Sequence, residues 1–388
     1  MKSLILRCED DARLTAATAS LLEGARLSHL QQLAQAGAAG LIGHPRHATV
    51  IDRLHLHQAL LGLHPDAPET APAWWYARSV GAEPATDETV WCCELMTQQD
   101  GHVIDVTAGN ITTTESDRLM QALNERFGSR QLRWITGQGS HHLLMAQESS
   151  FKVDGTLPQS APDALMGQRW KTHVPKGSAG EALHALMEDA SSLLEAHPVN
   201  RVRVDLGENP ANLVWLWGPA SGNPQPASTE RSASSGAIIS TSFPMRGLAH
   251  VLGWTWQEGP PSFEDASLRS LPESIETLLA RHDQVYAHLR IGAVDPVERL
   301  CAMERIDQLV LKPLTERLPH HGPWRLLVAV DDRVRQRVPF VAIGTGLPQQ
   351  PVPHLSADAL ASASLVFEDA EALCSWFTQG AGHGPGDM

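Results

Sequence analysis

The stretch HPVNRVRVDLGENPANLVWLWG, residues 197–218, decides the fold of this 388-residue chain. Its first half combines Pro, Asn and Gly with Arg201 and Arg203, and its second half is an apolar run with two tryptophans that stops at Gly218. This pattern predicts a helix end, a turn set by Pro and Asn, and a short buried strand. For HPVN and PAN, a structural role is favoured over ligand binding, because Pro and Asn commonly shape turns.

Around this stretch, strands alternate with helices. An amphipathic helix is expected before it, at 180–198, and apolar strands are expected at 3–7, 237–241, 284–291, 325–331 and 339–344. Helices are expected between the later strands, at 244–253, 270–282 and 296–318. Alternation of this kind is typical of an α/β fold with a parallel sheet.

A different pattern interrupts the alternation. Residues 89–106 predict two strands around an Asp100-Gly101 turn, a capped helix follows at 112–128, and two more strands are expected at 131–138 and 141–147. We therefore expect a core made of residues 1–84 and 166–375, and a small inserted α+β domain with its linker at 85–165. Residues 376–388 are expected to form a disordered tail.

Composition excludes several classes of function. The net charge is −14 and no Lys/Arg run is present, which argues against nucleic-acid binding. The five cysteines include no CxxC pair, which indicates reduced thiols in a cytosolic setting. No signal peptide and no apolar run of roughly 18–20 residues is found, so we expect a cytoplasmic protein without membrane contact.

Several segments share their order with one enzyme family. They are DVTAGNITTTESDRLMQALNERFG, GSHHLLMAQ, SGAIISTSFPMRGLAHVLGW, AMERIDQLVLKPL and VPFVAIG, together with the opening stretch. This series resembles the archaeal-type 2,3-bisphosphoglycerate-independent (cofactor-independent) phosphoglycerate mutases and their bacterial relatives, in the alkaline phosphatase superfamily. The resemblance implies a divergent bacterial member with an alkaline-phosphatase-like α/β core, a mostly parallel sheet flanked by helices, and a small inserted α+β domain.

The resemblance also implies a reaction with two divalent metal ions and a serine nucleophile. Glu9 stands where the family has its first metal-binding Asp, and a surface acid is the equally weighted alternative. Asp331 keeps an Asp position and Asp332 replaces a His, although nearby arginines could pair with both. The segment 289–298, which should carry another Asp and His, is shortened and lacks His, and Asp295-Pro296 in it predicts a helix start. Glu9, Asp331 and Asp332 are thus vestigial metal-ligand candidates.

The nucleophile position is also changed. An ungapped match of residues 52–62 to the family pattern puts Arg53 at the serine, and Arg cannot deprotonate to attack phosphorus. Thr49 reaches that place only through a register shift. His55 and His57 lie on different faces of a helix, so they cannot chelate one metal together, and we expect both at the surface.

The residues that by resemblance would bind a sugar phosphate are also replaced in this chain. The family's Arg-x-Asn becomes Cys92-Cys93-Glu94, and an acid there repels phosphate. His141 stands at an Arg position. The remaining candidate substrate-binding residues are Arg246, Arg201, Arg203 and His141.

Three hypotheses follow. The first is a pseudoenzyme that needs no cofactor and binds a small phosphorylated ligand or a protein partner. The second is an active phosphomutase or phosphatase that uses Mn²⁺, Mg²⁺ or Zn²⁺ with rearranged ligands. The third is a non-catalytic subunit that meets its partner through exposed Trp74 and Trp75, because aromatic pairs are enriched at interfaces.

Overall fold

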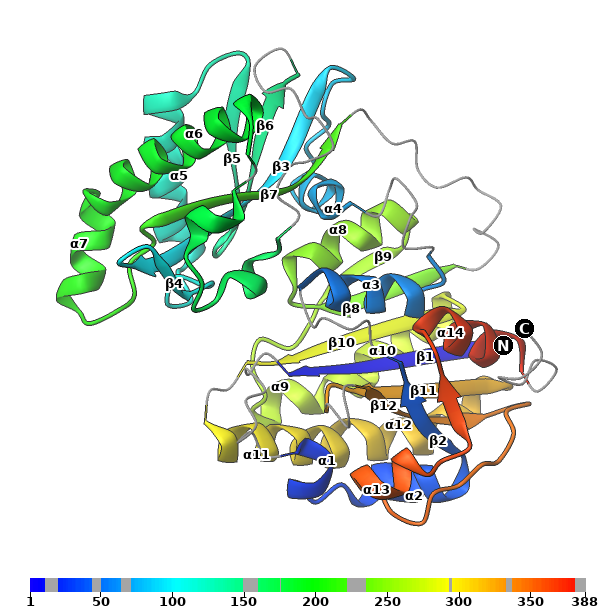
Figure 1. Cartoon of the computed structure of the whole chain (residues 1–388). Coiled ribbons are helices and arrows are strands. Elements are labelled where there is room, and N and C mark those ends of the chain that lie inside the picture. Colours follow the sequence, from blue (N-terminus) through cyan, green and yellow to red (C-terminus); the bar gives the residue numbers. More distant parts are fainter. Residues whose placement is uncertain are drawn as a thin grey trace.

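The computed structural model describes residues 1–10, 20–43, 50–63, 71–148, 160–174, 176–221, 235–292, 295–332 and 337–380, and the side chains of 50–53 and 178–179 are not part of that description. These residues form two separate β-sheets with helices packed on them (Figure 1). Among them, no helix combines the length and apolarity needed to cross a membrane.

The larger sheet has eight strands in the order β13-β2-β12-β11-β1-β10-β8-β9. Its strands are β1 (Lys2–Asp10), β2 (Ala38–Ile42), β8 (Gly236–Ser240), β9 (Thr255–Glu258), β10 (Gln284–Ile291), β11 (Trp324–Val330), β12 (Val338–Gly344) and β13 (Leu365–Phe367). The sheet is mostly parallel, which confirms the expected fold class. Only β12 runs antiparallel to its neighbours, because residues 331–337 are too short for a crossover helix.

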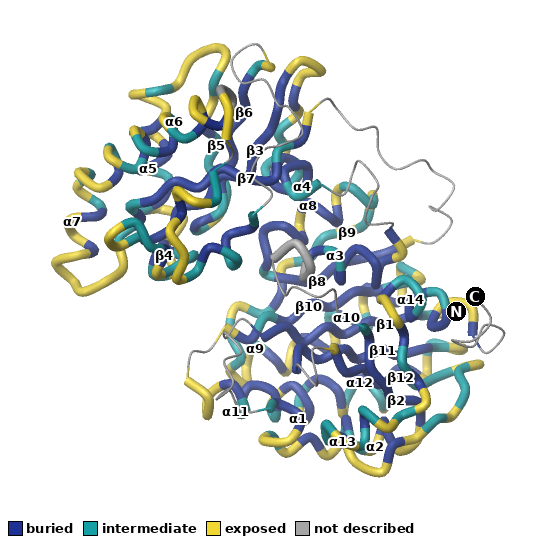
Figure 2. Tube along the Cα trace, in the orientation of Figure 1, coloured by how far each residue is buried: buried dark blue, intermediate teal, exposed yellow. Residues whose placement is uncertain are grey.

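Helices cover both faces of this sheet. Alternate residues of β1 serve the two faces: Leu4 and Leu6 pack into one buried cluster and Ile5 into the other. Figure 2 shows the sheet strands as the most continuously buried part of the chain. The helices of this unit are α1 (Leu21–Gly24), α2 (Ser28–Ala36), α3 (Val50–Leu60), α4 (Pro72–Ser79), α8 (Phe243–Leu252), α9 (Asp265–Arg269), α10 (Leu271–Arg281), α11 (Pro296–Ile306), α12 (Lys312–Arg317), α13 (Ala357–Ala361) and α14 (Ala370–Gln379).

The second sheet contains the strand of the opening stretch. It orders its strands β4-β3-β6-β5, and β7 pairs with β3. The bounds are β3 (Glu88–Gln99), β4 (His102–Asp105), β5 (Leu132–Gln138), β6 (His141–Gln147) and β7 (Leu213–Ser221), and the helices are α5 (Thr113–Phe127), α6 (Ser178–Glu195) and α7 (Pro198–Asp205). This sheet therefore extends to Ser221, and the expected end of the inserted unit at 165 is too early. An apolar strand pattern predicts burial but does not say which sheet buries it.

The HPVN and PAN motifs hold the turn before β7. His197 caps the first turn of α7, where its Nδ1 accepts from the Val199 N–H at 3.2 Å, so the motif begins a helix instead of ending one. Asn200 Nδ2 lies 2.7 Å from the Leu194 carbonyl, and its Oδ1 accepts from the Ala211 N–H at 2.7 Å. These buried bonds fit the structural role that the sequence favours.

Two further expectations need correction. Trp74 and Trp75 in α4 are only 3% and 0% exposed, so they offer no exposed aromatic pair to a partner. The expected tail from 376 overlaps α14, where Trp376 and Phe377 are buried. Residues 381–388, and the linker residues 149–159, lie outside the described residues.

Candidate functional site

The carboxyl ends of the parallel strands β1, β10 and β8 meet at one edge of the core sheet. In open α/β sheets, ligands bind at this edge. Arg7 on β1 lies opposite His288 on β10, and Glu9 follows two residues later on the same face of the sheet. Strand pairing therefore brings together side chains that lie nearly 280 residues apart in the sequence.

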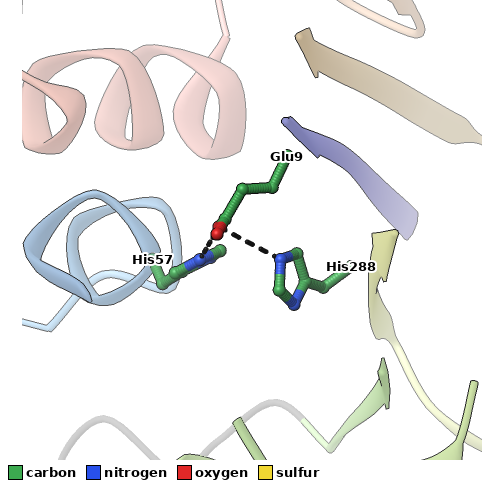
Figure 3. A group of neighbouring side chains, drawn as sticks. All are labelled: Glu9, His57 and His288. Atoms are coloured by element: carbon green, nitrogen blue, oxygen red, sulfur yellow. Dashed lines mark hydrogen bonds and ion pairs between the residues drawn. The ribbon is translucent and has the colours of Figure 1, made fainter. Parts of the chain in front are cut away.

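Glu9 is the centre of a buried cluster (Figure 3). Its Oε2 lies 2.9 Å from His57 Nε2 and 3.2 Å from His288 Nε2. His57 reaches the cluster from helix α3 and His288 from strand β10. His57 is 2% exposed, so the expectation that it lies at the surface is wrong. Glu9 is likewise buried and is not a surface acid.

The outer nitrogen of each imidazole is also held. His57 Nδ1 lies 2.5 Å from the Tyr286 hydroxyl, and His288 Nδ1 lies 2.9 Å from Ser240 Oγ. A hydroxyl can donate or accept, so these contacts orient the rings without fixing their tautomers. Partners of this kind behind the outer nitrogen are typical of histidines that ligate metals.

Electrostatics favour a charged carboxylate and neutral rings. Burial disfavours the Glu9 anion, but hydrogen bonds from His288 and His57 outweigh it and hold the pKa of Glu9 well below its usual value. Burial lowers the pKa of His288 to about 4 and also lowers the pKa of His57. Near neutral pH these are the protonation states that metal binding requires.

The two adjacent aspartates after β11 face different ways. Asp331 is buried, its Oδ2 lies 3.6 Å from an Arg7 guanidinium nitrogen, and this oxygen accepts no hydrogen bond from any described residue. Its charge acts on the pKa of His57, which places it near the cluster. Asp332 Oδ2 instead accepts from Ser20 Oγ at 2.6 Å and from the Leu22 N–H at 2.7 Å, at the start of α1. Asp332 therefore caps a helix and does not join Glu9.

The candidate residues for attack and phosphate binding are scattered. Thr49 lies outside the described residues, and Arg53 lies within α3 with its side chain outside them. Arg201 and Arg246 are exposed on α7 and α8. Arg203 is buried, where it donates to the Ala108 carbonyl at 2.8 Å and pairs with Glu115 at 2.8 Å. Arg203 thus stabilises a turn of the second sheet.

His141, which is partly exposed, belongs to a second cluster, which joins the second sheet to helix α4. Its Nδ1 lies 2.8 Å from Glu94, which also accepts from the Tyr76 hydroxyl at 2.8 Å. Burial raises the pKa of Tyr76 and lowers that of His288, and in both cases the Arg290 guanidinium is close enough to shift the pKa downwards. Arg290 therefore lies within electrostatic reach of both clusters.

Comparisons with known proteins agree with the resemblance. A family model described as 2,3-bisphosphoglycerate-independent phosphoglycerate mutase matches residues 34–200. A protein of that name from Methanosarcina mazei is 26% identical over 353 residues, which cover 85% of this chain and 86% of the relative. A second one, from Methanothermobacter thermautotrophicus, is 26% identical and covers 91% of this chain and 90% of its own. The chain is a homologue of the cofactor-independent phosphoglycerate mutases.

Solved structures extend this homology to the fold. The cofactor-independent phosphoglycerate mutase of Thermoplasma acidophilum aligns with a TM-score of 0.58 at 22% identity, over 98% of this chain and 99% of that one. The PH0037 protein of Pyrococcus horikoshii gives 0.67 at 15% identity, over 97% and 96%. The mutase homologue thus has the alkaline-phosphatase-like fold that its sequence predicts.

The donor set of the cluster fits a divalent metal ion. It offers one carboxylate and two imidazoles, and their ligand atoms lie within 4.8 Å of one another. Only Glu9 stands at a position where the mutase resemblance expects a ligand. His57 was expected at the surface, and His288, which immediately precedes the shortened segment 289–298, was not among the expected ligands.

Proposed function

We propose that this mutase homologue does not carry out the phosphoglycerate mutase reaction and acts by binding a small phosphorylated ligand or a protein partner. One observation carries the proposal. Helix α3, which by resemblance bears the serine nucleophile, presents the imidazole of His57 to Glu9 at 2.9 Å. By resemblance, the mutase mechanism needs an activated hydroxyl one turn earlier on this helix, where the chain has Arg53, which cannot supply one.

The second cluster supports the same proposal. Glu94 lies where the family pattern has a phosphate-binding segment. It is 1% exposed and accepts hydrogen bonds from Tyr76, His141 and Trp217. A carboxylate buried at this point repels a phosphate group. Arg203, one of the basic residues left for binding a phosphate, is held by the Ala108 and Asn209 carbonyls and by the carboxylates of Glu115 and Glu208.

The test is a turnover assay on the full chain. We would follow 3-phosphoglycerate by ³¹P NMR after equilibrating the protein with Mn²⁺ and, separately, Zn²⁺, with the Methanosarcina mazei relative as positive control. We expect no interconversion with 2-phosphoglycerate above that of Glu9→Ala. Interconversion that Glu9→Ala abolishes would overturn the proposal.

A phosphomutase or phosphatase with rearranged ligands is the second candidate, because the cluster of Glu9, His57 and His288 keeps three donors that can hold a divalent metal ion. Released inorganic phosphate, measured in the same samples, separates a phosphatase from a mutase. Phosphate release that His288→Asn and Glu9→Gln both abolish, while Arg201→Met retains it, would favour this candidate.

A further inference from the structure

We propose that Glu9, His57 and His288 bind one divalent transition-metal ion, with Asp331 beside it. Two of these three ligands fall at positions where the mutase resemblance assigns none. The site is therefore a property of this chain's own residues. Metal binding is independent of whether the chain turns over phosphoglycerate, so the two proposals can fail separately.

The distances already suit a shared ion. A zinc ion binds imidazole nitrogens at about 2.0–2.1 Å and carboxylate oxygens at about 2.0–2.2 Å, so ligands of a tetrahedral ion lie roughly 3.3 Å apart. The observed separations from Glu9 Oε2 are 2.9 Å to His57 Nε2 and 3.2 Å to His288 Nε2. An ion can thus replace the hydrogen-bonding protons, and the three ligand atoms, which lie within 4.8 Å of one another, would draw together around it.

The hydroxyl groups behind the rings allow this replacement without a net loss of protons. Without metal, each neutral ring donates its Nε2–H to Glu9 and accepts at Nδ1 from Tyr286 or Ser240. When Nε2 binds the ion, the ring proton resides on Nδ1 and the hydroxyl becomes its acceptor. Ser240 Oγ accepts from the Ser242 N–H at 3.0 Å and keeps a second lone pair for His288.

The ligand set also selects the class of ion. Two imidazoles and one carboxylate suit Zn²⁺, Co²⁺ and Ni²⁺, whereas Mg²⁺ and Ca²⁺ prefer sets made of oxygens. Three protein ligands leave a position for a further oxygen. Asp331 Oδ2 is a buried oxygen near His57 that accepts no hydrogen bond from the described residues, and an ion or its bound water would give it a partner.

The experiment measures metal binding on the full chain, stripped with a chelator. Zn²⁺ would be titrated by calorimetry, and Co²⁺ would be followed through its visible d–d absorption, which reports four-coordinate nitrogen and oxygen ligation. We expect one ion per chain at a high-affinity site. If the wild-type chain binds no Zn²⁺ or Co²⁺ with high affinity, the proposal is refuted, whatever the turnover assay shows.

Matched variants assign the ligands. His57→Gln and His288→Gln should each weaken binding by at least about tenfold and change the Co²⁺ spectrum, and Ser240→Ala should weaken it by about tenfold through loss of the outer contact. His250→Gln, at an exposed histidine of α8, should bind as wild type. Circular dichroism checks that each variant is folded. If a histidine variant is unfolded, the conservative Glu9→Gln variant replaces it in the binding measurements. Unchanged affinity and spectrum in folded Glu9→Gln would show that the ion binds elsewhere and would refute the site.

Discussion

Buried imidazoles play different parts in this chain, and their neighbours decide which. His57 and His288 have partners on both ring nitrogens. His142 is 0% exposed and uses only Nδ1, which accepts from the Gly137 N–H at 3.0 Å, while Nε2 has no partner among the described residues. Burial lowers the pKa of His142 to about 3, and the neighbouring His141 adds to this effect. His142 must therefore stay neutral in the folded chain.

This predicts a loss of stability in acid. The pKa of His142 is about 6.5 when unfolded and about 3 when folded, so the unfolded chain binds the proton first as pH falls. The stabilisation is complete above pH ~6.5 and declines toward pH ~3 by about 1.4 kcal/mol per pH unit. The loss at pH 5 is therefore about 2 kcal/mol. His142→Asn keeps an acceptor for the Gly137 N–H. It should remove this part of the pH dependence of the unfolding free energy, measured by urea unfolding between pH 7.5 and 5. The exposed His250→Asn should keep the wild-type slope, and a slope unchanged in His142→Asn would contradict the prediction.

Helices α4 and α8 cross at a glycine. A Cβ added to Gly247 would lie 1.8 Å from the Trp75 carbonyl oxygen, which Ser79 Oγ also approaches to 2.7 Å. Close backbone approach of this kind fixes α4, and α4 carries Tyr76 to Glu94. The crossing therefore positions one side of the second cluster.

Gly247→Ala is predicted to destabilise the chain by about 1–3 kcal/mol, because overpacking at the crossing outweighs the better helix propensity of Ala. Arg246→Ala, at the exposed neighbouring position, should stay within about 0.5 kcal/mol of wild type. Urea unfolding of both variants measures the difference. Equal or greater stability of Gly247→Ala would show that the two helices can move apart freely.

The helices and turns that local sequence patterns define could be predicted. The strands and side chains that each element contacts in the fold could not. The helix at Thr113–Phe127 has the expected Thr112 cap, and the Asp100-Gly101 turn has the positive φ angles that such hairpins require. The sheet that takes up β7 depends on pairing with a strand more than a hundred residues earlier, which periodicity does not reveal. His288 escaped notice for the same reason, because only the pairing of β1 with β10 brings it to Glu9.

At the scale of the whole molecule, the second sheet is completed only by β7. This strand pairs along β3 from Leu213 to Ser221 and places Trp215 and Trp217 in the core. A fragment of residues 85–221 is therefore predicted to fold by itself, whereas a fragment of 85–165 leaves β3 with an open apolar edge. Dispersed NMR amide signals and cooperative thermal unfolding are expected for the longer fragment only. Cooperative folding of the shorter one would restore the boundary at 165.

The chain enters and leaves the second sheet at neighbouring points. Thr89 lies opposite Ser221, and their hydroxyl oxygens are 2.8 Å apart. A segment whose two ends lie side by side can be exchanged through two peptide junctions without disturbing its host. The second sheet can therefore be replaced as one unit, while Glu9 and His288 in the core sheet and His57 on helix α3 keep their places.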